Sequence, residues 1–332
     1  LALNLDSLAR DAGSGCVLNT SGCGDFPGVG LANDQRGAGF ARSRGGAVDI
    51  GAYELGSVVV NNAQDSGAGS LRQAIADAMP GDVISFARPP FDQPQTVTLS
   101  STLVVNKTLT IVGPGAGLLT LDANNQRRHL NVDAPGTLHL SGMRFTRGNP
   151  GVGTGGAILN LGTLSADQIV VENSRSDGGG CIHNRGRLNL SRSRLSDCRA
   201  DFAAALFNEA GGVAIISDSR FENNIASGPA GGIANPAGAT LVLDRVSFSG
   251  NQGTIGGALN SYGTATLSHT TFSGNSASNG GAMYVGGTST TTLTHATVTL
   301  NTAQLNGGIA AEFDATVNPR GNVSAGNTPP VG

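Results

Sequence analysis

The sequence predicts an all-β protein, a right-handed parallel β-helix in which each repeat forms one coil of a solenoid. Three observations lead to this fold class: the composition, a repeat of 24 to 28 residues, and the alternation of apolar and polar residues within each repeat. The chain has 51 glycines among 332 residues, no tryptophan and only 4% aromatic residues. An average protein contains about 7% glycine. A repetitive β architecture uses glycine at its many turns and between its stacked layers.

A pair of small residues marks the repeat. The stretches "FSGNQGTIGGALN" (248–260) and "FSGNSASNGGAMY" (272–284) are near-copies of each other. The second small residue of successive pairs is Gly156, Gly180, Ala204, Gly232, Gly257, Gly281 and Gly308. Between the pairs, runs such as "TATLSHTTF" (264–272) alternate apolar and polar residues, which is typical of strands and not of helical repeats.

The repeats set the expected domain organisation. We expect residues 56–332 to form about eleven coils, which at ~4.8 Å per coil give a rod roughly 50 Å long. Residues 1–55 are expected to be a closing or linking segment, mostly loop with a few short strands.

An apolar residue followed three positions later by a polar one precedes each pair of small residues. Asn tolerates a left-handed backbone and suits a corner between strands. Stacked from coil to coil, such side chains can form a ladder of amide hydrogen bonds. The residues expected in this ladder are Asn173, Asn224, Asn251, Asn275 and Asn301, with Cys198 at the equivalent place in one repeat. The apolar partners Phe221, Phe248 and Phe272 are expected to stack inside the coils, so we interpret both rows as structural.

A short helix is expected at the front of the solenoid. Ser70 can cap the stretch 71–78, in which Leu71, Ile75 and Ala78 share one face. Pro80 and Gly81 end it. Such a helix covers the apolar core that the first coil would otherwise expose.

Several segments resemble a known family. The Gly-Gly-Ala-Ile and Phe-x-x-Asn elements resemble those of polymorphic outer-membrane and other secreted bacterial parallel β-helix proteins. Residues 58–86 and 102–123 are similar to the opening segment and first coils of a large group of bacterial surface proteins. Residues 34–54, "DQRGAGFARSRGGAVDIGAYE", resemble the segment that closes such a domain. The resemblance implies a β-helix exposed at the cell surface, in a family of diverse roles.

The order of these segments predicts end-to-end assembly. In the family pattern the closing segment follows the last coil, whereas here it precedes the opening segment. We therefore expect a head-to-tail joint, in which the closing segment finishes the β-helix of a preceding unit. The residues assigned to the joint are Asp34, Arg36, Asp49, Tyr53 and Glu54. The units can be joined covalently in one tandem polypeptide or non-covalently in a polymer, and the sequence of a single unit fits both. The expected partners are further copies of the chain.

Four cysteines form two local pairs. Cys16 and Cys23 lie in a polar loop, while Cys181 and Cys198 replace the usual Ala and Asn of neighbouring repeats. Two pairs in a Gly-rich chain that is expected to be secreted suggest disulfides. Zinc is the rival, but His partners at ligand spacing are missing.

Three classes of function follow from this fold. A structural or adhesive surface fibre needs stacking, low charge and disulfides. A polysaccharide lyase or hydrolase needs clustered carboxylates, or Ca²⁺ held by them. Asp177 and Asp201 are one repeat apart, and so, roughly, are Asp197 and Glu222; Arg175, Arg194 and Arg199 are close enough in sequence to neutralise them.

We favour the fibre, with no enzymatic activity and no cofactor, while Ca²⁺ stays an open alternative. The third class is a glycan-binding or ice-binding face, to which the Thr-rich strand at 288–302 points. The net charge of −3 and the absence of an apolar run long enough to span a bilayer argue against nucleic acid and membrane partners. The chain is expected to be secreted to the cell surface, where glycans are candidate partners.

Overall fold

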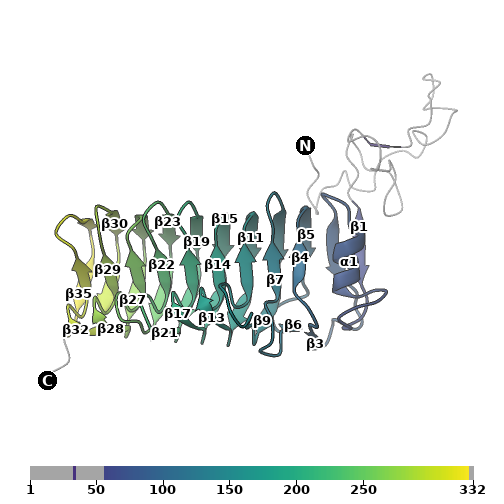
Figure 1. Ribbon diagram of the computed structural model, residues 1–332, viewed down its shortest axis with the longest axis horizontal. Coiled ribbons are helices and arrows are strands. Elements are labelled where there is room, and N and C mark those ends of the chain that lie inside the picture. Colours follow the sequence, from purple (N-terminus) through teal and green to yellow (C-terminus); the bar gives the residue numbers. More distant parts are fainter. Residues whose placement is uncertain (1–32, 35–55, 329–332) are drawn as a thin grey trace, which may run out of the picture.

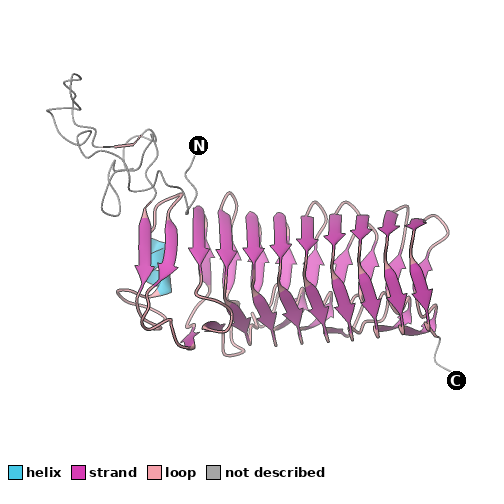
Figure 2. Cartoon of the chain, turned by 180° about the vertical axis from the view of Figure 1, so that it is seen from behind, coloured by secondary structure: helices cyan, strands magenta, loops and turns pink. Residues whose placement is uncertain are grey.

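The chain folds into a parallel β-solenoid, seen in a computed structural model that describes residues 33, 34 and 56–328 (Figure 1). Three long sheets run the length of the stack, and all of their strand pairs are parallel. Each complete coil contributes one strand to each long sheet, as Figure 2 shows from the other side, while the coils at the two ends contribute fewer. The predicted all-β class and coil architecture are therefore confirmed.

The first long sheet has 11 strands, most of them five residues long. Its strands are β1 (Ser57–Val60), β2 (Val83–Phe86), β5 (Thr108–Val112), β8 (Thr137–Ser141), β11 (Thr163–Asp167), β15 (Arg187–Ser191), β19 (Val213–Ser217), β23 (Thr240–Asp244), β26 (Thr264–Ser268), β30 (Thr290–Thr294) and β34 (Thr316–Arg320).

The second long sheet has nine strands and the third has ten. The nine are β4 (Leu103–Val105), β7 (Leu130–Val132), β10 (Ile158–Asn160), β14 (Ile182–Asn184), β18 (Leu206–Asn208), β22 (Ile233–Asn235), β25 (Leu259–Ser261), β29 (Met283–Val285) and β33 (Ile309–Ala311). The ten are β3 (Gln95–Thr98), β6 (Leu119–Asp122), β9 (Arg144–Thr146), β12 (Val170–Glu172), β16 (Arg194–Ser196), β20 (Arg220–Glu222), β24 (Ser247–Ser249), β27 (Thr271–Ser273), β31 (Thr297–Thr299) and β35 (Val323–Ala325).

A fourth face lies between the third sheet and the second, and it carries two short sheets. One consists of β13 (Arg175–Gly178), β17 (Arg199–Phe202) and β21 (Ile225–Ala226). The other consists of β28 (Ser276–Asn279) and β32 (Thr302–Leu305), and Gln252 bridges the two.

The core is the interior of the coils. On the long strands, residues alternate between the core and the surface, so that Leu241 and Leu243 of β23 are fully buried while their neighbours are half-exposed. The glycine pair is required by close approach: a Cβ on Gly257 would lie 2.2 Å from the carbonyl oxygen of Gly281 in the next coil. Because buried and exposed residues alternate along the strands and the corners are tight, the buried side chains of each coil form one thin layer of a continuous core.

The helix α1 (Leu71–Asp77) covers the first coil. Ser70 is its N-cap, and the Ser70 hydroxyl accepts a hydrogen bond from the backbone N–H of Gln73 at 3.2 Å. Leu71, Ala74 and Ile75 are buried against the core. Because an uncovered first coil would expose apolar side chains and strand edges, α1 acts as the predicted cap.

Candidate functional site: cross-coil ladders and a polar channel

A ladder of asparagines, all buried except the last, runs along one corner of the last five described coils. The Nδ2 of Asn224 donates to Oδ1 of Asn251 at 2.8 Å, and the Nδ2 of Asn251 donates to Oδ1 of Asn275 at 2.9 Å. The same arrangement continues through Asn301 to Asn327. From Asn251 onward, each Oδ1 in the row also accepts the backbone N–H of the preceding asparagine. These side chains replace water for backbone groups that a sharp corner leaves unpaired.

Asn173 does not belong to this ladder, which corrects the sequence prediction. Ser174 occupies the equivalent position, where its hydroxyl accepts the N–H of Gly148 at 3.0 Å. Asn173 is exposed one residue earlier and has a positive φ of 51°. Asparagine suits a left-handed corner as well as a ladder. The residue type alone therefore assigned the ladder position to Asn173, although it belongs to the next residue, Ser174.

A second asparagine ladder was not predicted. It joins the ends of β10, β14, β18 and β22, where Asn160 donates to Asn184 at 2.6 Å and Asn184 donates to Asn208 at 2.8 Å. Asn208 continues to Asn235, which donates to the hydroxyl of Ser261. Its signal was in the sequence, since an Asn stands four residues after the second small residue of three successive repeats, Gly156, Gly180 and Ala204, and three residues after Gly232.

The aromatic row lies inside the ladder corner. The rings of Phe221 and Phe248 stack with centroids 4.9 Å apart, and those of Phe248 and Phe272 with centroids 5.0 Å apart. All three side chains are fully buried. In the same register, Leu195 precedes Phe221 and Val298 follows Phe272, so aliphatic side chains also fit this row.

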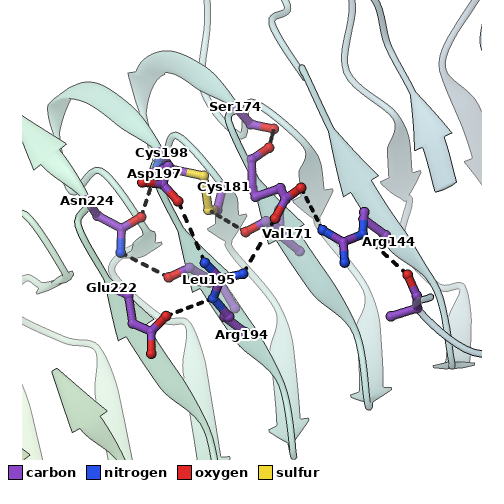
Figure 3. Close-up of polar contacts among 12 residues, drawn as sticks. Arg144, Val171, Ser174, Cys181, Arg194, Leu195, Asp197, Cys198, Glu222 and Asn224 are labelled. Atoms are coloured by element: carbon purple, nitrogen blue, oxygen red, sulfur yellow. Dashed lines mark hydrogen bonds and ion pairs between the residues drawn. A yellow bond between two sulfur atoms is a disulfide. The ribbon is translucent and has the colours of Figure 1, made fainter. Parts of the chain in front are cut away.

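Cys181 and Cys198 form a disulfide with their Cα atoms 5.6 Å apart (Figure 3). Cys181 takes the place that Ala157 and Ala205 have in the adjacent coils, and Cys198 takes a place in the asparagine ladder. The bond therefore links two corners of one coil through its core. The other predicted pair, Cys16 and Cys23, lies outside the described residues.

Arginines neutralise one of the two predicted acidic columns. The Nε of Arg194 lies 2.7 Å from Oε2 of Glu222, and its other nitrogens lie 3.6 Å from Glu172 and 3.8 Å from Asp197 (Figure 3). On the same face, Arg144 pairs with Glu172 at 2.7 Å. These half-exposed pairs bridge coils, and they leave no isolated pair of carboxylates here.

The other acidic column lies in a channel on the fourth face. Asp177 and Asp201 line a hollow of ≈430 Å³ together with Arg175 and Arg199. Asp177 accepts the backbone N–H of Gly153 at 2.8 Å, and Asp201 accepts the Ser227 hydroxyl at 3.2 Å. Within the described part of the chain, none of these four charged side chains forms an ion pair.

The channel continues along the next coils. A second hollow of ≈560 Å³ begins at Ile225 and ends at Gln304. One side of the channel is the column Arg175, Arg199, Ile225, Gln252, Ser276 and Thr302, which the strand register joins. Two positions further along each strand lies a second column, Asp177, Asp201, Ser227, Thr254, Ser278 and Gln304. The backbone between the columns forms the floor, because the intervening residues, such as Ala200 and Ala226, point into the core.

Among the residues that the structure describes, no three His, Cys, Asp or Glu side chains lie together as a metal centre. No helix in the same ranges is long and apolar enough to cross a membrane. Asp34 is described and buried, while Arg36, Asp49, Tyr53 and Glu54 lie outside the described residues.

Comparisons with known proteins give no family. No family model matches the chain, and no curated protein matches it. Among solved structures, the chain is similar to ORF18 of Geobacillus virus E2, with 11% identity and a TM-score of 0.37 over 82% of this chain. It spans 62% of that protein. It is also similar to the catalytic unit of a thermostable GH87 alpha-1,3-glucanase from Streptomyces thermodiastaticus strain HF3-3, with 15% identity, a TM-score of 0.25, and 82% and 70% of the two chains covered. At these TM-scores the likenesses carry no information about activity.

Proposed function

We propose that the chain is a unit of an extracellular structural or adhesive β-helix fibre, in which consecutive units join head to tail at a bacterial cell surface. The observation that carries this proposal is the difference between the two ends of the described stack. The first coil is covered by α1, whereas the outer edge of the coil formed by β33, β34 and β35, called the open edge below, has no neighbour among the described residues.

The open edge carries exposed apolar side chains. Phe313 is fully exposed, and Leu305 and Val323 are 63% and 60% exposed. The three long sheets end here, so one side of each last strand has no neighbour in the described residues. Unpaired strand edges and exposed apolar side chains favour association with another β layer. A following segment of the same polypeptide or a separate subunit would satisfy the edge equally well.

Two further observations support the proposal. Residues 34–54 resemble a segment that closes a β-helix, although they precede this β-helix in the chain. The disulfide between Cys181 and Cys198 is consistent with an oxidising, extracellular compartment. Because a head-to-tail contact joins two different surfaces, repetition gives a filament and not a closed dimer.

Electron microscopy of the native material tests the proposal. We expect filaments with an axial repeat of one β-helix, roughly 50 Å at ~4.8 Å per coil. The variant Phe313→Ser should shorten the filaments, whereas Val152→Ser, a change at a 91% exposed residue far from the edge, should not. Dispersed single particles of the wild-type protein would contradict the joint and favour an intramolecular cap.

A polysaccharide lyase or hydrolase is the second candidate, because Asp177 and Asp201 share one hollow. The backbones of successive coils lie about 4.8 Å apart, and retaining glycosidases hold two carboxylates about 5 Å apart. Incubation with polygalacturonate and alginate tests this candidate. Release of unsaturated or reducing ends, lost in Asp201→Asn, would favour the enzyme over the fibre. Continued absence of products with the folded protein would favour the fibre.

A further inference from the structure

We propose that the channel on the fourth face binds a linear, neutral polysaccharide that lies parallel to the solenoid axis. The proposal is independent of end-to-end assembly, since the channel lies along the side of the rod and not at its ends. It goes beyond the fibre role because it gives the surface a ligand.

The shape of the channel suits a polymer. Two hollows of ≈430 and ≈560 Å³ follow one another along consecutive coils, the first ending at Asp201 and the second beginning at Ile225. Residues two apart on a strand lie about 7 Å from each other, and coils are about 4.8 Å apart. A linear chain along the channel therefore meets the same two columns of side chains at every coil.

The chemistry of the columns suits hydroxyl groups. From Ser227 to Gln304 the outward side chains are mainly hydroxyls and primary amides, each able to donate and accept hydrogen bonds. Many of them are exposed, including Gln252 and Thr254. A neutral sugar polymer presents hydroxyls with the same dual capacity along its whole length.

The charges at one end of the channel cancel. Arg175 and Arg199 lie on one side of the channel, and Asp177 and Asp201 lie on the other. The two sides are two residues apart along each strand, which is about 7 Å. The side chains of Arg175 and Arg199 have no hydrogen bond or ion pair with any described residue, so their N–H groups are free for a ligand. Equal numbers of opposite charges disfavour a polyanion or a polycation and favour a neutral ligand.

A peptide fits the channel less well. Peptides that add to β-sheets need a free strand edge. Here the strands are stacked along the axis, and the backbone N–H of Gln252, for example, already donates to Asn224 at 2.8 Å. The floor therefore offers few backbone groups to an extended peptide.

The columns contain no aromatic side chain. Each site therefore lacks the stacking surface that aromatic rings give to a ligand, and we expect weak binding per unit. If units are repeated in a fibre, many weak sites act together and raise the overall affinity.

Affinity electrophoresis of the full chain tests the proposal, with gels that contain dextran, mannan or hydroxyethyl cellulose as neutral probes and polygalacturonate as the anionic probe. We expect at least one neutral polymer to retard the protein, and polygalacturonate to retard it less. Arg199→Gln and Asp201→Asn should each weaken retardation about threefold to tenfold, as expected for the loss of one or two hydrogen bonds.

A blocking variant and its matched control keep the test specific. Thr254→Trp places a bulky ring in the channel, and Thr264→Trp places the same ring on the outer face of β26; both residues are exposed. We expect Thr254→Trp to abolish retardation and Thr264→Trp to leave it unchanged, with unfolding temperatures alike. No retardation by any neutral polymer, stronger retardation by polygalacturonate, or wild-type retardation of Thr254→Trp would each overturn the proposal.

Discussion

The backbone N–H of Cys198 donates to Oδ1 of Asn224 at 3.0 Å, so Cys198 occupies a rung of the asparagine ladder while its side chain forms a disulfide. One coil later, the Nδ2 of Asn224 donates to the carbonyl of Leu195 at 3.0 Å. In the preceding coil, the equivalent carbonyl is that of Val171. The Sγ of Cys181 lies 3.6 Å from the oxygen of this carbonyl. The disulfide therefore stands where the repeat elsewhere has an Ala and an Asn.

The double variant Cys181→Ala/Cys198→Asn should restore the repeat. Asn at position 198 gains an amide that can donate to the Val171 carbonyl, so the corner keeps its hydrogen bonds without the disulfide. Reduction of the wild-type protein should cost about 2–4 kcal/mol of unfolding free energy, whereas the double variant should be insensitive to reductant. Urea unfolding with and without dithiothreitol measures both effects. If Cys181→Ala/Cys198→Ser proves as stable as the Asn variant, the ladder adds nothing at this rung.

Asn275→Ala should destabilise the solenoid strongly. The side chain is fully buried, accepts the N–H and Nδ2 of Asn251, and donates to the carbonyl of Phe248 and to Asn301. Its removal leaves several buried polar groups without partners, at about 1–3 kcal/mol each. We expect a loss of about 3 kcal/mol or more in urea unfolding. Asn318→Ala, at an exposed residue, is the control and should change stability by less than about 0.5 kcal/mol.

The coil architecture was predictable because a solenoid repeats its constraints at every turn. The small residue at Gly257 is required by a carbonyl of the next coil, and the same contact recurs at Gly281 with the carbonyl of Gly307. Because this close contact recurs once per coil, small residues recur at a regular interval in the sequence. The helix α1 was predictable for a local reason, since Ser70 supplies a cap and the apolar residues share one face.

The sequence assigned single residues to the wrong row where one residue type suits two neighbouring rows. Asn173 lies in a row of left-handed corners that also contains Asn223, Gly250 and Gly274, directly before the ladder row. Sequence spacing alone does not separate neighbouring rows when repeats vary in length. The channel beyond the predicted pair Asp177 and Asp201 was missed for another reason: its columns join an Asp, a Ser and a Thr with no shared residue type, and only the strand register brings them into line.

The same row of corners gives a stabilising substitution. Leu300 has a positive φ of 56°, at a position where Gly250, Gly274 and Gly326 stand in other coils. A left-handed conformation costs a residue with a Cβ about 1–2 kcal/mol. We expect Leu300→Gly to raise the unfolding free energy by about 1 kcal/mol, after the added entropy of glycine in the unfolded chain is subtracted.

A matched control separates backbone strain from loss of an apolar side chain. Leu305 is 63% exposed, as Leu300 is, but it lies on the strand β32 and is not among the residues with positive φ. Leu305→Gly should therefore lower stability in the same urea titration. Equal destabilisation by both substitutions would show that the corner at residue 300 carries no strain.

The stability of the solenoid should depend on pH through His129. This side chain is fully buried, its Nε2 donates to the carbonyl of Thr146 at 2.8 Å, and its Nδ1 has no partner. Burial lowers the pKa of His129 to about 4, although the hydrogen bond to Thr146 and the charge of Asp122 oppose this shift. In the unfolded chain the pKa is about 6.5.

Between these two pKa values the unfolded state binds a proton that the folded state does not. Stability from His129 is therefore complete above about pH 6.5, falls as the pH drops toward 4, and changes no further below that. A shift of this size corresponds to a loss on the order of 3 kcal/mol. Since the side chain of Gln stays neutral over this range, His129→Gln should lose less unfolding free energy than the wild-type protein between pH 7 and pH 4.5. Urea titrations at the two pH values measure the difference, and His139→Gln, a change at an exposed residue, serves as the control. A pH dependence that is the same in all three proteins would mean that His129 is protonated as readily in the folded chain as in the unfolded one.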